Sequence, residues 1–145
     1  MRPHISVLTL GVSDLERALA FYRDGLGLPT EGIIGTEFDH GSVVFFKMND
    51  ALILALYPAA FLSQDASIDA TQNRLGAVSI AHNVGSKEEV DGVLQQARQA
   101  GGTVTDAARD RFWGGYSGYF HDLDGHLWEI AWNPHLMVPA VSLPE

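Results

Sequence analysis

The same order of predicted elements occurs twice along this chain, and that duplication constrains the fold more than any other feature. In the first half, a strand at residues 5–12 precedes a helix that begins at Ser13, and three strands follow. In the second half, a strand at residues 77–84 precedes a helix that begins at Ser86, again with three strands after it. Because one such unit buries both a helix and a sheet face poorly, we expect the two units to pair in one domain.

Both helices are predicted from the same signals. Ser13 with Glu16, and Ser86 with Glu89, have the Ser-x-x-Glu spacing of a capping box. Apolar residues follow each cap at helical spacing, which predicts that one face of each helix is buried. Paired glycines end the two helices: Gly25 and Gly27 in the first, Gly101 and Gly102 in the second.

The remaining strands complete a βαβββ order in each half. Strands are predicted at residues 30–38, 42–48 and 51–57, and then at 103–105, 115–121 and 127–132. The predicted boundaries are about 4–57 for the first repeat, 58–75 for a connector, 76–134 for the second repeat and 135–145 for a tail. The sequence therefore predicts a single α+β domain. Its paired βαβββ modules form a cupped, eight-stranded mixed sheet with the helices on the outer face and a ligand cup inside.

Composition excludes several classes of function. Nine Lys and Arg oppose eighteen Asp and Glu, for a formal charge of −9, so we expect neither a nucleic-acid partner nor an anionic membrane surface. Without cysteine, the chain has no disulfide, thiolate nucleophile or cysteine-ligated metal. We find no signal-peptide pattern, and no apolar run approaches the roughly 20 residues that span a bilayer. A cytoplasmic location is expected.

Two motifs resemble those of a known superfamily. The first is GVSDLERA at residues 11–18, with Phe21-Tyr22 and GLGL at 25–28; the second is DLDGHLWEI at residues 122–130. Both resemble the vicinal oxygen chelate superfamily, which contains glyoxalases, bleomycin-resistance proteins, fosfomycin-resistance enzymes and extradiol dioxygenases. The stretch FWGGYSGYF at 112–120 is similar to an uncharacterised glyoxalase-like branch. The resemblance covers nearly the whole chain and implies the paired βαβββ fold.

The resemblance also implies four positions for the ligands of a divalent metal. Three of them hold residues that are not the usual His or Glu: Val7, a position near Leu54, and a position near Ser79. The fourth matches Glu129. A divalent ion needs roughly three or more protein ligands to be held firmly, so we expect neither the superfamily's metal site nor any other cofactor.

The histidines do not rebuild such a site by their spacing. No two of them have the i, i+4 or His-x-His spacing that metal sites favour. We therefore expect structural or solvent-exposed histidines at all six positions, which are His4, His40, His82, His121, His126 and His135.

Glu129 is the strongest candidate for a functional residue. Strand alternation places Glu129 on the face opposite Trp128, Ile130 and Trp132, so its carboxylate points into the cup while those three pack under the helices. There it could act as a general base or anchor a ligand. The alternative is a structural carboxylate that is hydrogen-bonded to Ser79, Thr9 or a buried water.

Aromatic residues and two arginines lie just before this strand. We expect Trp113 and Tyr116 to form a stacking wall for a planar ligand, and two solvated arginines at Arg109 and Arg111. The candidate ligand-binding residues are Val7, Thr9, Leu54, Ser79, Trp113, Tyr116, Tyr119 and Glu129.

Three functions remain open. The first is a metal-free protein of the bleomycin-resistance type, which binds a small apolar or aromatic molecule in the cup. The second is a metal-dependent lyase or isomerase of glyoxalase type, or a dioxygenase. The third is a metal-independent enzyme with Glu129 as base and a nearby tyrosine as acid. The resemblance also implies a homodimer in which a partner chain completes the cup.

Overall fold

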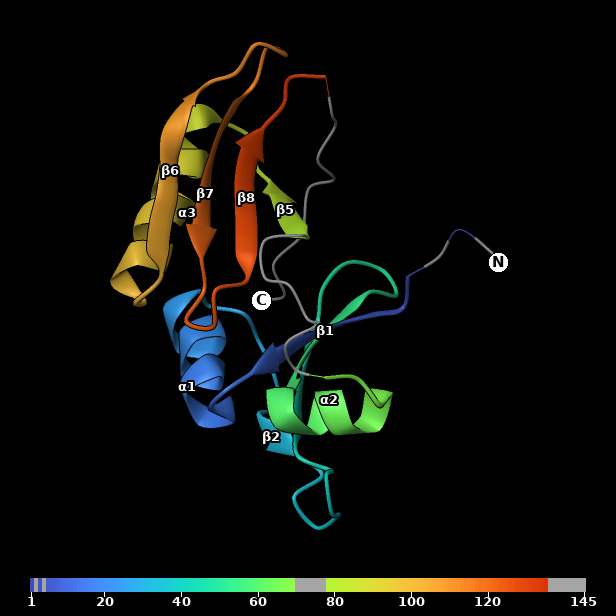
Figure 1. Ribbon diagram of the computed structural model, residues 1–145. Helices are drawn as coiled ribbons and strands as arrows, with labels where there is room; N and C mark the ends of the chain where they lie inside the picture. The colour runs from blue at the N-terminus through green and yellow to red at the C-terminus, as the bar shows by residue number, and fades with distance from the viewer. Residues whose placement is uncertain (2, 4, 70–77, 136–145) are drawn as a thin grey trace.

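The eight strands form two sheets of four strands each (Figure 1). The computed structural model describes residues 1, 3, 5–69 and 78–135. Sheet 1 has the order β1 (Val7–Val12), β4 (Ile53–Pro58), β3 (Val43–Lys47) and β2 (Ile33–Ile34). Sheet 2 has the order β5 (Ser79–Asn83), β8 (Leu127–Trp132), β7 (Tyr116–His121) and β6 (Thr103–Asp110). In both sheets the first two strands in this order are parallel and the remaining pairs are antiparallel.

One face of each sheet is covered by a helix. Helix α1 (Leu15–Leu19) continues into a π-helical turn, η1 (Ala20–Gly25), and packs against sheet 1. Helix α3 (Lys87–Gln99) packs against sheet 2 and lies behind β6 and β7 in Figure 1. The predicted α+β fold of two paired βαβββ modules is confirmed, with its eight strands divided between two hydrogen-bonded sheets.

Strand alternation divides the side chains of each sheet between two faces. In β3, Val44 and Phe46 are fully buried in the core, whereas Phe45 between them is 41% exposed. In β1, Leu10 is buried and Val7 is 46% exposed. We call the face of each sheet opposite its helix the open face. Side chains on these two open faces are the ones available to a ligand.

The two modules share one core, and Tyr22 lies where they meet. Its ring packs against Phe46 of sheet 1 and Trp128 of sheet 2, with ring centroids 6.0 Å apart in both pairs. Two hydrogen bonds reinforce this junction: the Ser13 backbone N–H donates to Asp124 Oδ1 at 2.8 Å, and His126 Nε2 lies 2.7 Å from the Gly11 carbonyl oxygen. The β7–β8 turn is thereby held against the start of α1.

The connector contains a helix that the sequence did not predict, α2 (Ala59–Ala66). A Cβ on Gly11 would lie only 3.3 Å from Ala59 and Leu62, so this helix crosses β1 on the open face of sheet 1. It covers the Gly11 end of that face and leaves the Val7 end exposed.

Two strands differ in length from their predictions. Only Ile33–Ile34 of the predicted strand at 30–38 is extended, because the chain turns back at Gly35 and Gly41, whose backbones are almost in contact. The short strand predicted at 103–105 continues to Asp110, with irregular pairing to β7 along its length. Such irregularities change the direction in which side chains point, and here they affect Asp106 and Arg109.

The helix caps follow the prediction in one module only. Ser86 caps α3, since its Oγ accepts the Glu89 backbone N–H at 3.1 Å. The predicted Ser13 cap is wrong: Asp14 caps α1 by accepting the Arg17 N–H. The Ser13 backbone instead turns toward Asp124, which leaves the next residue at the cap position.

Some predictions lie outside the described residues, namely His4, residues 70–75 of the connector, residues 76 and 77 at the start of the second repeat, and residues 136–145 of the tail. Within residues 5–69 and 78–135, no helix has both the length and the apolar character needed to span a membrane.

Candidate functional site

Glu129 and Tyr119 lie side by side on the open face of sheet 2. The register of the sheet aligns Ala81 of β5, Glu129 of β8 and Tyr119 of β7 in one row. Trp128 and Ile130, on either side of Glu129 in sequence, are buried on the helix-covered face. The prediction that alternation directs Glu129 away from the core is thus confirmed by the burial of its neighbours.

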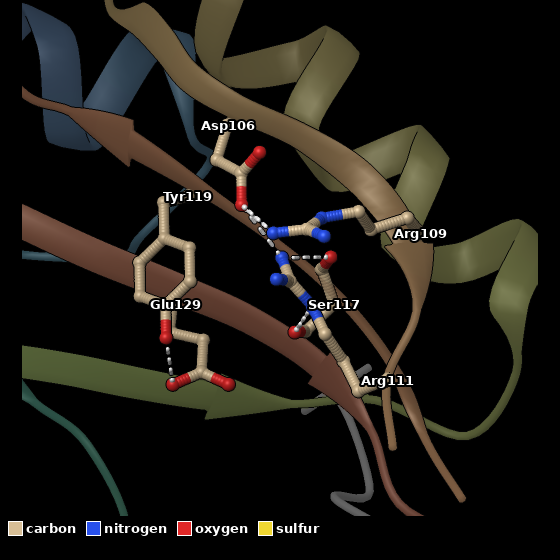
Figure 2. A network of polar contacts seen from close by, with 6 residues as sticks. All are labelled: Asp106, Arg109, Arg111, Ser117, Tyr119 and Glu129. Carbon is tan, nitrogen blue, oxygen red and sulfur yellow. Dashed lines mark hydrogen bonds and ion pairs between the residues drawn. The ribbon is translucent and has the colours of Figure 1, made fainter.

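The two side chains are hydrogen-bonded. The Tyr119 hydroxyl donates to Glu129 Oε2 at 3.1 Å (Figure 2). Burial of the tyrosine, followed by this hydrogen bond and the negative charge of Glu129, raises the Tyr119 pKa. In the described part of the chain, Tyr119 is the sole hydrogen-bond partner of this carboxylate. Glu129 Oε1 and a lone pair of the hydroxyl oxygen therefore remain able to accept hydrogen bonds from a ligand.

Arg111 supports the tyrosine from the other side. Its guanidinium carbon lies 5.7 Å from the centroid of the Tyr119 ring. The guanidinium donates to Ser117 Oγ at 2.8 Å, to the Ser117 carbonyl at 2.8 Å and to Asp106 Oδ2 at 3.0 Å (Figure 2). Only 14% of this side chain is exposed, so these contacts hold the guanidinium in one orientation.

Asp106 balances the charge of this arginine. It accepts hydrogen bonds from both Arg111 and Arg109, and the first of these is the main reason that the Asp106 pKa lies below its usual range. The expectation of two solvated arginines is wrong for Arg111, which is held inside the network, while Arg109 is largely exposed. Sequence reasoning missed Asp106 and Ser117, because the irregular β6–β7 pairing that brings them together has no local pattern.

The residues at the four expected metal positions do not fit a divalent ion. Val7 and Leu54 carry no ligand atom, Ser79 offers only a hydroxyl, and Glu129 is the single carboxylate. Moreover, Tyr119 is hydrogen-bonded to that carboxylate. Among the described residues, no group of three His, Asp or Glu side chains is placed to hold a metal ion.

The structure corrects two of the candidate ligand-binding residues. Leu54 is buried in the core, because β4 pairs it with Leu8 and not with Thr9. A shift of one residue along a strand moves a side chain to the other face. Tyr116 also lies on a helix-covered face, where its hydroxyl donates to Asp91 of α3 at 2.7 Å.

The other candidates lie on the open faces or at their edge. Val7 and Thr9 are exposed on sheet 1, whereas Ser79 is exposed on sheet 2, one row from Glu129. Trp113 lies in the turn between β6 and β7 and folds over Gly115, where an added Cβ would clash with its ring. The geometry brings Tyr119 and Glu129 together, with Arg111 in support.

Two histidines have structural contacts. His126 binds the Gly11 carbonyl, and His40 stacks on Phe61 with ring centroids 4.0 Å apart. Both contacts agree with the expectation of structural histidines at these two positions.

Comparison with known proteins places this site in a family. The family model described as the Glyoxalase/Bleomycin resistance protein/Dioxygenase superfamily matches residues 4–130. The chain belongs to this superfamily. The resemblance noted in the two sequence motifs is thereby confirmed. No curated protein matches the chain.

Solved structures of superfamily members share the fold. A glyoxalase-related enzyme from Fulvimarina pelagi is 33% identical over 95% of this chain and 94% of its own, with a TM-score of 0.82. A lactoylglutathione lyase from Agrobacterium tumefaciens is 27% identical over 90% of this chain and 94% of its own, with a TM-score of 0.62. A family enzyme from Burkholderia phytofirmans PsJN, 16% identical over 88% of this chain and 96% of its own, has a TM-score of 0.71 and shows the fold alone.

Proposed function

We propose that this superfamily member binds a small apolar or aromatic molecule through the open face of sheet 2 and that Glu129 anchors it without a metal. The observation that carries this proposal is the Tyr119–Glu129 pair, which leaves one carboxylate oxygen available on that face. An amine or hydroxyl of the ligand would donate to that oxygen. A charge-assisted hydrogen bond of this kind is roughly twice as strong as a neutral one.

The surroundings of the pair favour a ligand that donates hydrogen bonds. Asp106 pairs with both Arg109 and Arg111, which leaves these three side chains with one net positive charge. The negative charge of Glu129 offsets it, so the group as a whole has no net positive charge. The chain as a whole carries a formal charge of −9, which attracts cations and repels anions at long range. We therefore propose an aromatic amine, or a neutral aromatic molecule with a hydroxyl, as the ligand class.

A second candidate function is metal-independent acid–base catalysis by the same pair. It is favoured by the 3.1 Å contact, which places an acid and a base within proton-transfer distance of one another. Glu129 would take a proton from the substrate through Oε1, which removes its negative charge and weakens its hold on the Tyr119 hydroxyl. Tyr119 would then turn its O–H to the developing anion and give up that proton, and the proton held by Glu129 would restore the Tyr119 hydroxyl. The similarity to a lactoylglutathione lyase supports an enzyme, but the metal positions of this chain lack the donors for metal-dependent chemistry.

The proposal includes a homodimer in the cytoplasm. Strands β1 and β5 are edge strands of the two sheets, and large apolar side chains are exposed on or beside them at Ile5, Val7 and Val78. An exposed apolar edge favours association with a second copy. A chain without cysteine is also compatible with a reducing compartment. Sedimentation velocity on wild type, Val7→Asp and Val78→Asp tests the dimer, with Phe112→Asp as the control for an exposed apolar residue elsewhere.

A ligand screen tests the binding function. Aromatic amines, phenols and carboxylates are screened by their effect on the melting temperature, and each hit is titrated calorimetrically against wild type and Glu129→Gln. We expect hits among the amines and phenols, with affinity that falls about tenfold in the variant. Equal affinity of a hit for wild type and Glu129→Gln would contradict the proposal that Glu129 anchors the ligand. Conversion of a hit into product by wild type but not by Glu129→Gln favours the catalytic alternative.

A further inference from the structure

A pocket of about 550 Å³ lies on the other sheet, away from Glu129. Its floor is the open face of sheet 1 and its wall is the segment that precedes β2. The residues that line it are Pro29, Thr30, Glu31, Gly32, Ile34, Phe45, Lys47 and Ile53. This volume is within the range of small-molecule sites.

The floor of the pocket is apolar and exposed. Phe45 is 41% exposed although it lies between the buried Val44 and Phe46, and Ile34 is 39% exposed. Ile53 of β4 is paired with Lys47 of β3, next to Phe45 on the same face. A ring or branched chain placed here would cover apolar surface that now faces water.

The wall of the pocket is fixed to the sheet by hydrogen bonds. The Thr30 hydroxyl donates to the Phe45 carbonyl at 2.6 Å, and the Gly32 N–H donates to Thr30 Oγ1 at 3.2 Å. The backbone at Gly32 has a φ of +85°, and nothing lies within 4 Å of the position of an added Cβ. The pocket is therefore preformed and remains open beside Gly32.

Two side chains of opposite charge line the pocket, Lys47 on its floor and Glu31 in its wall. Neither Lys47 nor Glu31 forms an ion pair or a side-chain hydrogen bond among the described residues. By contrast, the other lysine, Lys87, is paired with Asp110 at 2.7 Å. An anion alone would meet the repulsion of Glu31, and a cation alone that of Lys47.

We propose that this pocket binds a zwitterionic amphiphile of the aromatic α-amino acid class. The ligand carboxylate pairs with Lys47, the ammonium pairs with Glu31, and the aromatic ring lies on Phe45. This site is separate from the Glu129 site and does not depend on the function proposed for it.

Three related probes test the two charges of the ligand separately. L-Tryptophan has both charges, 3-indolepropionate lacks the ammonium group, and tryptamine lacks the carboxylate. Calorimetric titration should show that wild type binds L-tryptophan about three- to fivefold more tightly than either analogue, the modest scale of exposed ion pairs.

Matched variants assign each charge to its residue. Lys47→Gln should weaken the binding of L-tryptophan and slightly tighten that of tryptamine, because the repulsion between Lys47 and the tryptamine cation is removed. Glu31→Gln should weaken the binding of L-tryptophan and slightly tighten that of 3-indolepropionate, because the repulsion between Glu31 and this anion is removed. Phe45→Ala should weaken the binding of all three probes. Lys87→Gln and Phe112→Ala are the controls, and each should retain wild-type affinity for L-tryptophan.

Several results would overturn this proposal. One is the absence of saturable L-tryptophan binding at millimolar concentration. Another is equal affinity in wild type, Lys47→Gln and Phe45→Ala. A third is a change in sedimentation coefficient for Phe45→Ala with unchanged affinity for the probes, because it would assign this face to a second copy of the chain. Loss of L-tryptophan binding in Glu129→Gln alone would assign the probe to sheet 2 instead.

Discussion

The Tyr22 hydroxyl donates a 2.6 Å hydrogen bond to Asp122, 100 residues further along the chain. Both residues are buried, and the bond joins the helical segment of the first module to the β7–β8 turn of the second. The other Asp122 oxygen accepts the backbone N–H groups of Asp124 and His126, and Trp128 Nε1 donates to the Tyr22 oxygen at 3.1 Å. One buried carboxylate thus shapes the turn and holds the two modules together.

Tyr22→Phe should destabilise the protein by about 1–3 kcal/mol, because it leaves buried polar atoms of Asp122 and Trp128 without their partner. Tyr57→Phe is the control, since the Tyr57 hydroxyl binds the exposed Asp65. Loss of the Tyr57 hydroxyl should lower the free energy of unfolding by much less than loss of the Tyr22 hydroxyl. Urea unfolding at pH 7 measures both. An equal effect of the two variants would contradict a special role for the buried bond.

The same tyrosine predicts a loss of stability at high pH. Burial, followed by the nearby charge of Asp122, raises the pKa of Tyr22 above its usual value of about 10. A group whose pKa is raised on folding contributes stability that is complete below its unfolded pKa and is lost as the pH rises toward the folded pKa. The stability difference between wild type and Tyr22→Phe should therefore narrow above pH 10. A constant difference from pH 7 to pH 11 would contradict this linkage.

The fold could be predicted because its signals are local and occur twice. Apolar periodicity, the Ser86 cap and the Asp124-Gly125 turn each depend on a few neighbouring residues. Ser13 was mistaken for a cap because its backbone binds Asp124, a contact across 111 residues that no local pattern reveals. Helix α2 has only eight residues and none of them is buried, so it lacks the long stripe of core-facing residues by which a sequence pattern reveals a helix.

The site could be predicted only in part. Alternation within β8 was sufficient for Glu129, since Trp128 and Ile130 identify the buried face. Tyr116 and Tyr119 lie three residues apart in one strand and therefore face opposite ways. The same rule thus shows that only one of them can lie on the open face with Glu129. The burial of Leu54 could be predicted only with knowledge of the register between β1 and β4. The place of Arg111 in the hydrogen-bond network could be predicted only with knowledge of the irregular β6–β7 pairing. Both depend on contacts between distant segments.

The helix caps provide a prediction that separates the structure from the sequence pattern. Ser86→Ala and Asp14→Ala should each cost about 1 kcal/mol, because each leaves a first-turn N–H without its acceptor. Ser13→Ala should be close to neutral, since Ser13 contributes only its backbone N–H to Asp124. Thermal melts of the three variants provide the measurement. If Ser13→Ala were as destabilising as Ser86→Ala, the result would contradict the Asp14 cap and support a capping box at Ser13.

Metal analysis provides a further prediction. The purified protein should hold no stoichiometric divalent metal after growth with added nickel and zinc, because Glu129 is the only metal-ligating side chain at the four expected positions. Elemental analysis by mass spectrometry checks this, and Glu129→Ala serves as the matched variant. About one ion per chain in wild type, absent from the variant, would contradict it.

Glu129 should be dispensable for folding, in contrast to Trp128 beside it. A carboxylate that is partly removed from water costs stability unless it is hydrogen-bonded, and Glu129 has one such bond, from Tyr119. Glu129→Gln keeps an oxygen that can accept this bond and removes the charge, so its stability should equal or slightly exceed that of wild type. Trp128→Ala should cost about 3–5 kcal/mol, because it deletes a buried ring that packs on Phe120 and Tyr22.

Thermal melts and ultraviolet titration of the tyrosines distinguish a functional from a structural Glu129. Burial is the main cause of the raised Tyr119 pKa, and the hydrogen bond to Glu129 and the charge of that carboxylate raise it further. Glu129→Gln removes the charge and weakens the hydrogen bond, so it should lower the Tyr119 pKa part of the way toward its usual value. Subtraction of the titration of the Tyr119→Phe protein isolates this one tyrosine. A melting temperature of Glu129→Gln far below that of wild type would show that the carboxylate has a structural role. An unchanged Tyr119 titration would show that the pair does not form in solution.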